Sequence, residues 1–293
     1  MARVKRIGLA ALAVVLVGGA AAYAFQARIG TWLFERGTAQ RMGTDNLAVL
    51  GDGLHVGLCG TGSPMPNLDR AGPCNVVIAG RQMFVVDIGE GAAETLNVMG
   101  ISPGKADGLL LTHFHSDHID GFGPLMLFHW TRGASTAPLP VYGPSGVEAI
   151  VAGFNAAYAT DNTYRIAHHG TKVVPPSGAG GVARPFEMTD PTTRVLKRNG
   201  LTITAFTVNH DPIKPSVGYR FDYKGRSLCI SGDTKKSANL EAVCKGVDIL
   251  VHEALNSGLV QKMETAAAAD GQVGAAKIMH DIQDYHSSPS EAA

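Results

Sequence analysis

The feature that most constrains this chain of 293 residues is a cluster of ionisable side chains that directly follows a buried strand. Residues 108–112 (Gly-Leu-Leu-Leu-Thr) are almost continuously apolar, which is typical of a strand covered on both faces. His113, His115, Asp117 and His118 come next. The two-residue period of an extended chain places His113 and His115 on the same side. Imidazole and carboxylate groups bind borderline metals such as zinc, so the cluster predicts a metal site where the strand ends.

Two later apolar runs end in ligand groups of the same kind. The run 201–208 is followed by His210, and the run 227–231 is followed by Asp233. Open α/β sheets place their sites at the carboxyl ends of strands, so we interpret both residues as further ligands. Six ligand groups suit two ions better than one. Asp233 is the natural bridge between them, because a carboxylate has two oxygens whereas an imidazole cannot span two ions.

Short apolar runs and turn signals indicate an α/β fold with a mixed sheet and helices outside it. Two hairpins are expected, at Gly80-Arg81 and at Lys224-Gly225. The segment 169–191, rich in Pro and Gly, is expected to be a loop or insertion. Strands are expected at 55–59, 75–79, 83–87, 108–112, 139–142, 201–208, 217–223, 227–231 and 248–252, and helices at 92–99, 146–158, 238–245 and 273–285.

The amino terminus has the pattern of a targeting segment. Three basic residues, the last of them Arg6, precede an apolar run over 7–25 that carries no charge. We divide the chain into a signal anchor or signal peptide (1–27), a linker (28–46) and a catalytic domain (47–293). Ala22-Tyr23-Ala24 would permit cleavage, but we favour retention as a membrane anchor. Because basic flanks stay in the cytoplasm, we expect the domain to be exported to the periplasm or cell envelope.

Cysteine usage and composition narrow the class of protein. No Cys-x-x-Cys pair occurs among Cys59, Cys74, Cys229 and Cys244, which disfavours a thiolate zinc site. Export would permit disulfides, in any of three pairings, and buried free thiols are an equal alternative. Hydrophobic residues make up 45% and charged residues 17%, which excludes a disordered chain. The formal net charge of zero argues against broad binding of a phosphate backbone.

The carboxyl end predicts the start of one more helix. Ser288-Pro-Ser-Glu291 is a capping box with Pro at the first helical position, yet Ala293 follows almost at once. A helix of one turn has no cooperative stability of its own. We therefore expect the domain to be truncated at this end.

The motif His-x-His-x-Asp-His after a strand resembles the metallo-β-lactamase superfamily, whose fold is a four-layer αβ/βα sandwich of two similar halves. Further motifs resemble its ribonuclease Z-like branch, in the same order over about residues 50–293. They lie at 60–64, 87–91, 209–211, 231–234, 251–254 and 286–288.

The resemblance implies a role for each site residue. His113, His115 and His210 would bind one zinc, Asp117 and His118 the other, and Asp233 would bridge them. His286 would be a catalytic histidine that does not bind metal, and His252 would support the ligands. Asp117 would also orient a metal-bridging hydroxide, while Asp87 and Thr112 are candidates to fix imidazole tautomers by hydrogen bonds.

The sequence departs from this branch in three ways. The family's last ligand histidine follows the His286 motif, where this chain ends, so the second zinc site is one ligand short. The arm that grips transfer RNA is not recognisable in 163–181, which instead contains His168 and His169. An exported protein would not meet transfer RNA, and periplasmic members of the branch include arylsulfatase-like enzymes.

These observations predict a dinuclear zinc hydrolase that cleaves a phosphodiester or aryl sulfate ester in a small anionic substrate, with a metal-bridging hydroxide. The expected partners are that ester and, through an uncleaved amino-terminal segment, a membrane. Nucleic acid is not favoured, and a homodimer is one option. The alternatives are a ribonuclease Z-type endoribonuclease that processes transfer RNA 3′ ends and a non-catalytic metal-binding envelope protein.

Overall fold

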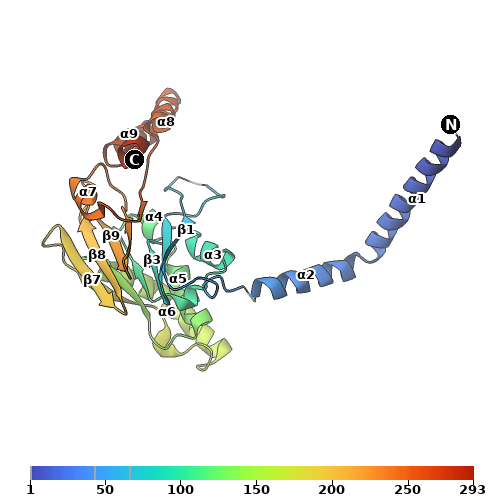
Figure 1. Cartoon of the computed structure of the whole chain (residues 1–293), viewed down its shortest axis with the longest axis horizontal. Coiled ribbons are helices and arrows are strands. Elements are labelled where there is room, and N and C mark those ends of the chain that lie inside the picture. Colours follow the sequence, from blue (N-terminus) through green and yellow to red (C-terminus); the bar gives the residue numbers. More distant parts are fainter. Residues whose placement is uncertain (1, 43, 66) are drawn as a thin grey trace. The chain divides into compact units, whose positions relative to one another are not determined.

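The computed structural model describes residues 2–42, 44–65 and 67–293, in two units that are considered separately here (Figure 1). The unit Met1–Ala48 contains helices α1 (Ala2–Ala24) and α2 (Gln26–Met42). Helix α2 occupies most of the segment expected to be a linker. Among the described residues, one stretch is long and apolar enough to cross a membrane, Arg6–Ala24 in α1. Met1 and Gly43, which belong to the expected anchor and linker, lie outside the described residues.

The unit Val49–Ala293 is built on two sheets. The first has the order β1-β2-β3-β4-β5-β6, in which β1 to β3 are antiparallel and β3 to β6 are parallel. The second has the order β11-β10-β9-β8-β7 and is antiparallel except for the pair β10–β11. The strands are β1 (Leu54–Gly60), β2 (Cys74–Ala79), β3 (Gln82–Val86), β4 (Gly108–Leu110), β5 (Leu139–Pro144), β6 (Gly181–Phe186), β7 (Thr192–Arg198), β8 (Leu201–Thr207), β9 (Val217–Tyr223), β10 (Arg226–Ile230) and β11 (Ile249–Val251).

The two sheets bury a shared core between them. Phe84, Val86 and Leu110 of the first sheet cluster with Tyr219 and Phe221 of the second, and all five are fully buried. Alternate residues of β8 are buried, as expected for a strand with one face on the core. Burial of apolar side chains in this core is the main favourable contribution to the free energy of folding of such a domain.

Helices cover the outer faces. Helices α3, α5 and α6 contact the first sheet, and α7 contacts β8 and β9 of the second, which completes the expected four-layer sandwich. Helices α8 and α9 pack on each other at one end of the sheets (Figure 1). The helices are α3 (Ala92–Val98), α4 (Ser116–Ile119), α5 (Phe122–Gly133), α6 (Val147–His169), α7 (Ala238–Cys244), α8 (Ser257–Ala269), α9 (Val273–Asp281) and α10 (Pro289–Ala292), with 3-10 turns at Pro103–Lys105, Pro176–Gly178 and Ile282–Asp284.

The expected loop at 169–191 is wrong in part, because it contains strand β6, which pairs in parallel with β5. Strand β7 was also not expected. Both strands lie at sheet edges and carry polar or exposed residues, and β6 includes Pro185. An edge strand tolerates Pro and needs little apolar pattern, so neither segment carries the usual strand signal.

Local signals at the Lys224-Gly225 turn and the carboxyl end agree with the structure, which also gives the cysteine pairing that the sequence left open. Lys224 and Gly225 both have positive φ and join β9 to β10, as a two-residue hairpin requires. The four cysteines form two disulfides, Cys59–Cys74 and Cys229–Cys244. The capping box at Ser288 is present and begins α10.

Candidate metal centre

The first part of the candidate site is the corner between β4 and α4. His115 lies at the amino-terminal cap of α4, and Asp117 and His118 lie in its single turn. Nε2 of His113 lies 3.0 Å from Nδ1 of His115, so these two ring nitrogens face a common point. His113 and His118 are almost fully buried. The short connection from strand to helix therefore presents the predicted cluster on one side.

The second sheet brings His210 and Asp233 to this corner from two separate loops. The main chain joins the loops, because Lys235 N–H donates to the carbonyl oxygen of Asn209 (2.9 Å). Ligand atoms of His113, His115, His210 and Asp233 all lie within 4.8 Å of one another.

The remaining two predicted ligands lie beside this group. Oδ2 of Asp233 is 3.3 Å from Nε2 of His118 and 3.9 Å from Nε2 of His113, and Oδ2 of Asp117 is 3.8 Å from Nε2 of His118. The structure thus brings all six predicted ligand residues together, with Asp233 between the two sides of the cluster.

The donor set suits a divalent metal, commonly zinc. Nε2 of His210 is buried and has no hydrogen-bond partner within the described part of the chain. Nε2 of His118 is also buried and faces the carboxylates of Asp233 and Asp117. A buried nitrogen without a partner is costly, and a cation would satisfy Nε2 of His210. Imidazole nitrogen with carboxylate oxygen is the usual donor set of catalytic zinc sites.

Asp87 supports the imidazoles from behind. Its carboxylate accepts hydrogen bonds from the Thr112 N–H, the Thr112 hydroxyl and Nδ1–H of His118, each at 2.8 Å. Because the hydroxyl donates its only proton to Asp87, it accepts from Nδ1–H of His113 (3.0 Å). Both rings therefore carry their proton on Nδ1, which leaves an unprotonated Nε2 able to bind a metal. Asp87 has a φ of 56°, a strained backbone conformation that persists only where surrounding contacts enforce it.

The glycine motifs act in packing. The turn that follows Asp87 lies directly under the corner, where a Cβ on Gly89 would come within 2.3 Å of the carbonyl oxygen of Asp117. A Cβ on Gly60 would lie 1.8 Å from the carbonyl oxygen of Gly72. Gly62 N–H donates to the carbonyl oxygen of Ala71 (2.7 Å), so this donor is already used within the protein. The bond favours a turn that ends β1 over a site in which main-chain N–H groups of 60–64 bind an anion.

His286 lies at the edge of the cluster, beside a residue that the sequence analysis missed. Its ring centroid is 5.4 Å from that of His210. Nδ1–H of His286 donates to Oε1 of Glu253 (3.1 Å), which also accepts from the N–H groups of Ser287 (2.9 Å) and Thr234 (3.2 Å). Glu253 therefore connects the segments that carry Asp233 and His286. It follows His252 in the motif at 251–254, and this position was the available signal.

Two further imidazole rings bond to main-chain carbonyl oxygens. Nδ1–H of His210 donates to the main-chain carbonyl of Tyr285 (2.9 Å), which leaves Nε2 facing the cluster. A main-chain acceptor 75 residues away has no signature in side-chain type. The ring of His252, which is expected to support the ligands, donates to the carbonyl oxygen of Glu253 (2.7 Å).

Charge and burial shift the pKa values of the cluster strongly. Burial lowers the pKa of His113 to about 2, and neighbouring His118 adds to the effect. Burial raises the pKa of Asp117. Burial also opposes ionisation of Asp233, but the contact with His118 and the charges of His118, His113 and His286 together outweigh burial, and the pKa of Asp233 falls well below its usual value. The pKa of His286 is raised, because its bond to Glu253 and the charge of Asp233 outweigh its burial.

Comparisons with known proteins agree with this geometry. A model of the beta-lactamase superfamily domain matches residues 84–293. Ribonuclease Z of Mycobacterium bovis is 36% identical over 243 residues, covering 82% of this chain and 80% of that protein. Ribonuclease Z of Mycobacterium avium is 36% identical over 242 residues, with the same coverage. The crystal structure of human tRNase Z, short form, shares the fold with a TM-score of 0.56 at 20% identity, covering 80% of this chain and 85% of that chain.

The chain belongs to the metallo-β-lactamase superfamily and, within it, to the ribonuclease Z-like branch. Fold, donor cluster and relatives together support a metal-dependent hydrolase that acts on phosphoester bonds. They favour the ribonuclease Z-type alternative over the aryl sulfate or small anionic ester that the sequence analysis placed first.

Proposed function

We propose that this protein is a ribonuclease Z-type phosphodiesterase that cleaves RNA endonucleolytically. The observation that carries the proposal is the likeness to ribonuclease Z over 80% of that protein's length, together with a ligand cluster assembled from both halves of the fold. A formal net charge of zero does not oppose this function, because a nuclease needs positive charge only where the substrate lies against it.

Different residues of the site bind the metal and transfer protons. We propose two zinc ions, one bound by His113, His115 and His210 and the other by Asp117 and His118, with Asp233 between them. Bound zinc ions supply Lewis-acid chemistry, which neutralises charge on a phosphate and lowers the pKa of a water. In this arrangement Asp117 orients the attacking water.

His286 is positioned for the leaving group. Its Nδ1–H is occupied by Glu253, and its raised pKa favours a protonated ring. We propose that its other nitrogen, Nε2, donates a proton to the leaving oxygen or stabilises charge on the phosphate.

The test uses the purified full chain loaded with zinc and three substrates. A transfer-RNA precursor with a 3′ trailer, bis(p-nitrophenyl) phosphate and p-nitrophenyl sulfate are offered in parallel, with D233A as the blank. We expect the precursor to be cut at one position and the sulfate to remain intact. Turnover of the sulfate without cleavage of RNA would overturn the proposal. Turnover of the phosphodiester alone would restrict it to a phosphoester hydrolase that does not act on RNA.

We also propose that the hydrolase domain is exported and that α1 anchors it. One line of support is the apolar stretch Arg6–Ala24 with basic residues at its start, which is typical of an exported or anchored chain. The other is the pair of disulfides, because disulfides persist in oxidising compartments. An exported enzyme would act on RNA or phosphodiesters outside the cytoplasm.

Protease added to intact spheroplasts tests this location. We expect the domain to be digested while a cytoplasmic marker survives. Protection of the domain until the cells are lysed would place it in the cytoplasm.

A further inference from the structure

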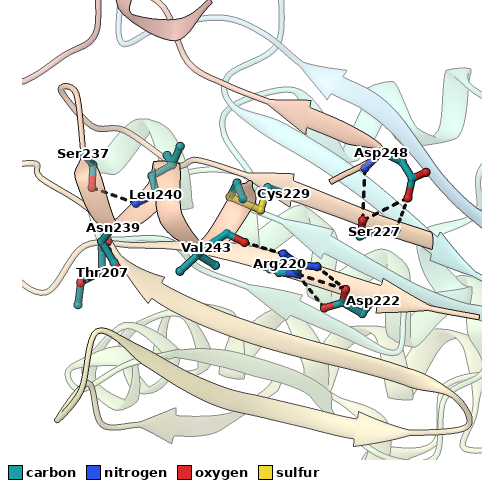
Figure 2. The surroundings of a disulfide bond; sticks show 11 residues. Thr207, Arg220, Asp222, Ser227, Cys229, Ser237, Asn239, Leu240, Val243 and Asp248 are labelled. Carbon is teal, nitrogen blue, oxygen red and sulfur yellow. Dashed lines mark hydrogen bonds and ion pairs between the residues drawn. A yellow bond between two sulfur atoms is a disulfide. The ribbon is translucent and has the colours of Figure 1, made fainter. Parts of the chain in front are cut away.

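Helix α7 connects the two loops that supply His210 and Asp233. It begins directly after the Asp233 loop, where the side chain of Ser237 caps it by accepting from the N–H of Leu240 (3.3 Å). The amide of Asn239 then donates to the carbonyl oxygen of Thr207 (2.9 Å), the last residue of β8 before the His210 loop (Figure 2). Both ligand loops of the second sheet are therefore attached to the start of one short helix.

The other end of α7 is fixed by a disulfide. Cys244, its last residue, is bonded to Cys229 in β10, the strand that leads to Asp233. Beside this bond, Nη1 of Arg220 donates to the carbonyl oxygen of Val243 (2.6 Å) while Asp222 pairs with the same guanidinium (Figure 2). The disulfide thus closes a ring of chain that contains Asp233.

Among the described residues, the apolar cluster that holds α7 against the sheet is small. Its buried members are Phe206, Cys229, Leu240 and Cys244, half of which belong to the disulfide, and Val208, Val243 and Val247 pack against them partly buried. The main core between the sheets contains 14 buried residues. Docking of α7 therefore depends on the covalent bond to a greater degree than docking of the strands does.

We infer that the Cys229–Cys244 disulfide is a redox-dependent positioning device for the metal centre, acting through α7 on His210 and Asp233. With the bond formed, α7 keeps both ligand loops in register with the His113–His118 corner. With the bond reduced, the loops move more freely and the centre retains zinc less well. The inference rests on the proposed zinc-dependent function, but it concerns metal retention and not turnover.

The redox step balances with a dithiol as reductant. One reductant thiolate attacks Sγ of Cys244, which is 7% exposed, whereas Cys229 is fully buried. A mixed disulfide forms and Cys229 leaves as a thiolate. The second reductant thiol then displaces Cys244, so the reductant becomes a disulfide and both cysteines become thiols. Two electrons and two protons pass from reductant to protein.

The experiment follows zinc release from the zinc-loaded full chain into an excess of a chromogenic chelator. We compare the oxidised protein, the protein reduced with dithiothreitol and freed of it by anaerobic gel filtration before zinc is loaded, C229A/C244A and the matched control C59A/C74A, which removes the other disulfide. We expect release from the reduced protein and from C229A/C244A to be faster by about tenfold or more, the scale seen when groups that support ligands are lost. C59A/C74A should change the rate by less than about threefold, because its disulfide lies between β1 and β2.

A second variant keeps the test decisive if C229A/C244A does not fold. N239A removes the hydrogen bonds of α7 to Thr207 and leaves both disulfides in place. It should also speed zinc release from the oxidised protein, with faster hydrogen exchange in α7. The inference is overturned if the reduced protein releases zinc at the rate of the oxidised parent, or if C59A/C74A has the same effect as C229A/C244A. Unchanged release from N239A would overturn the route through α7 to the His210 loop. Failure of RNA cleavage alone would count against the proposed function and not against this inference.

Discussion

The two halves of the sandwich supply the metal centre in different ways. The first half provides four ligand residues within one strand-to-helix corner, supported by a single buried carboxylate, Asp87. The second half provides His210 and Asp233 from separate loops, and their support comes from the Tyr285 carbonyl, Glu253 and α7. The first half therefore contains a local unit, whereas the second half depends on contacts between segments far apart in the chain.

The ligand loops of the second half are therefore the part of the site that can loosen most easily. A local corner that is hydrogen-bonded to buried groups changes only if that part of the fold unfolds. Loops joined through a short helix and a disulfide can loosen while the core between the sheets stays intact, because local stability is not uniform across a structure. In the chain-entropy description, a disulfide that closes a loop of about 15 residues contributes ~3 kcal/mol. This is a large share of the stability of a typical domain, which is about 5–15 kcal/mol.

The largest expected effect comes from D233A, which would show whether both halves serve one centre. Asp233 approaches His118 and His113, so its removal takes a shared contact away from both sides of the cluster. We expect phosphodiesterase activity to fall by ~10⁴-fold or more, the scale for an essential group. Zinc content should fall as well, measured by elemental analysis after gel filtration. H115A should match it, and a D233A protein with full zinc and turnover would separate the two halves functionally.

A smaller effect is expected from H286A. His286 belongs to the second half and is proposed to act on the leaving group without binding zinc. The variant should keep its zinc, because His286 bonds to Glu253 and lies beside the cluster. The rate should fall by about 10²–10⁴-fold, as when a general acid is removed. Single-turnover cleavage and zinc analysis on the same sample check this. E253Q is the control: it should retain part of the rate, since a glutamine oxygen still accepts from the main-chain N–H groups.

How much of the fold and of the site could be predicted depends on how far apart in the sequence the contacting residues lie. The His113–His118 corner was predictable because ligand type, spacing and the preceding strand all lie within residues 108–118. His210 and Asp233 were predictable only because each follows a strand. The Tyr285 carbonyl was not predictable, because a main-chain acceptor carries no residue signal. The disulfide pairing was open in the sequence, and the edge strand β6 was hidden by its Pro and Gly residues.

A more modest effect is expected from D87N, which weakens the local support of the first half. The amide still accepts one hydrogen bond but cannot accept from Thr112 and His118 as the carboxylate does. We expect zinc affinity to fall by about 10–100-fold, the range for groups that orient metal-binding histidines. Competition with a chelator measures it. The control T112S should retain near-parental affinity because it keeps the hydroxyl. An unchanged affinity in D87N would show that the corner orients its histidines without Asp87.

The smallest expected effect comes from Y285F, which tests how the second half fixes His210. The contact to Nδ1–H of His210 is made by the main-chain carbonyl of Tyr285, and a phenylalanine at this position keeps both that carbonyl and the ring that lies 5.2 Å from His210. Zinc release and the cleavage rate should therefore stay within about twofold of the parent, which is within the ordinary range for a substitution that removes no supporting contact. A tenfold fall in rate with unchanged zinc would instead assign the Tyr285 hydroxyl to the substrate. Tyr285 would then have two roles, to hold His210 through its main-chain carbonyl and to contact the substrate through its hydroxyl.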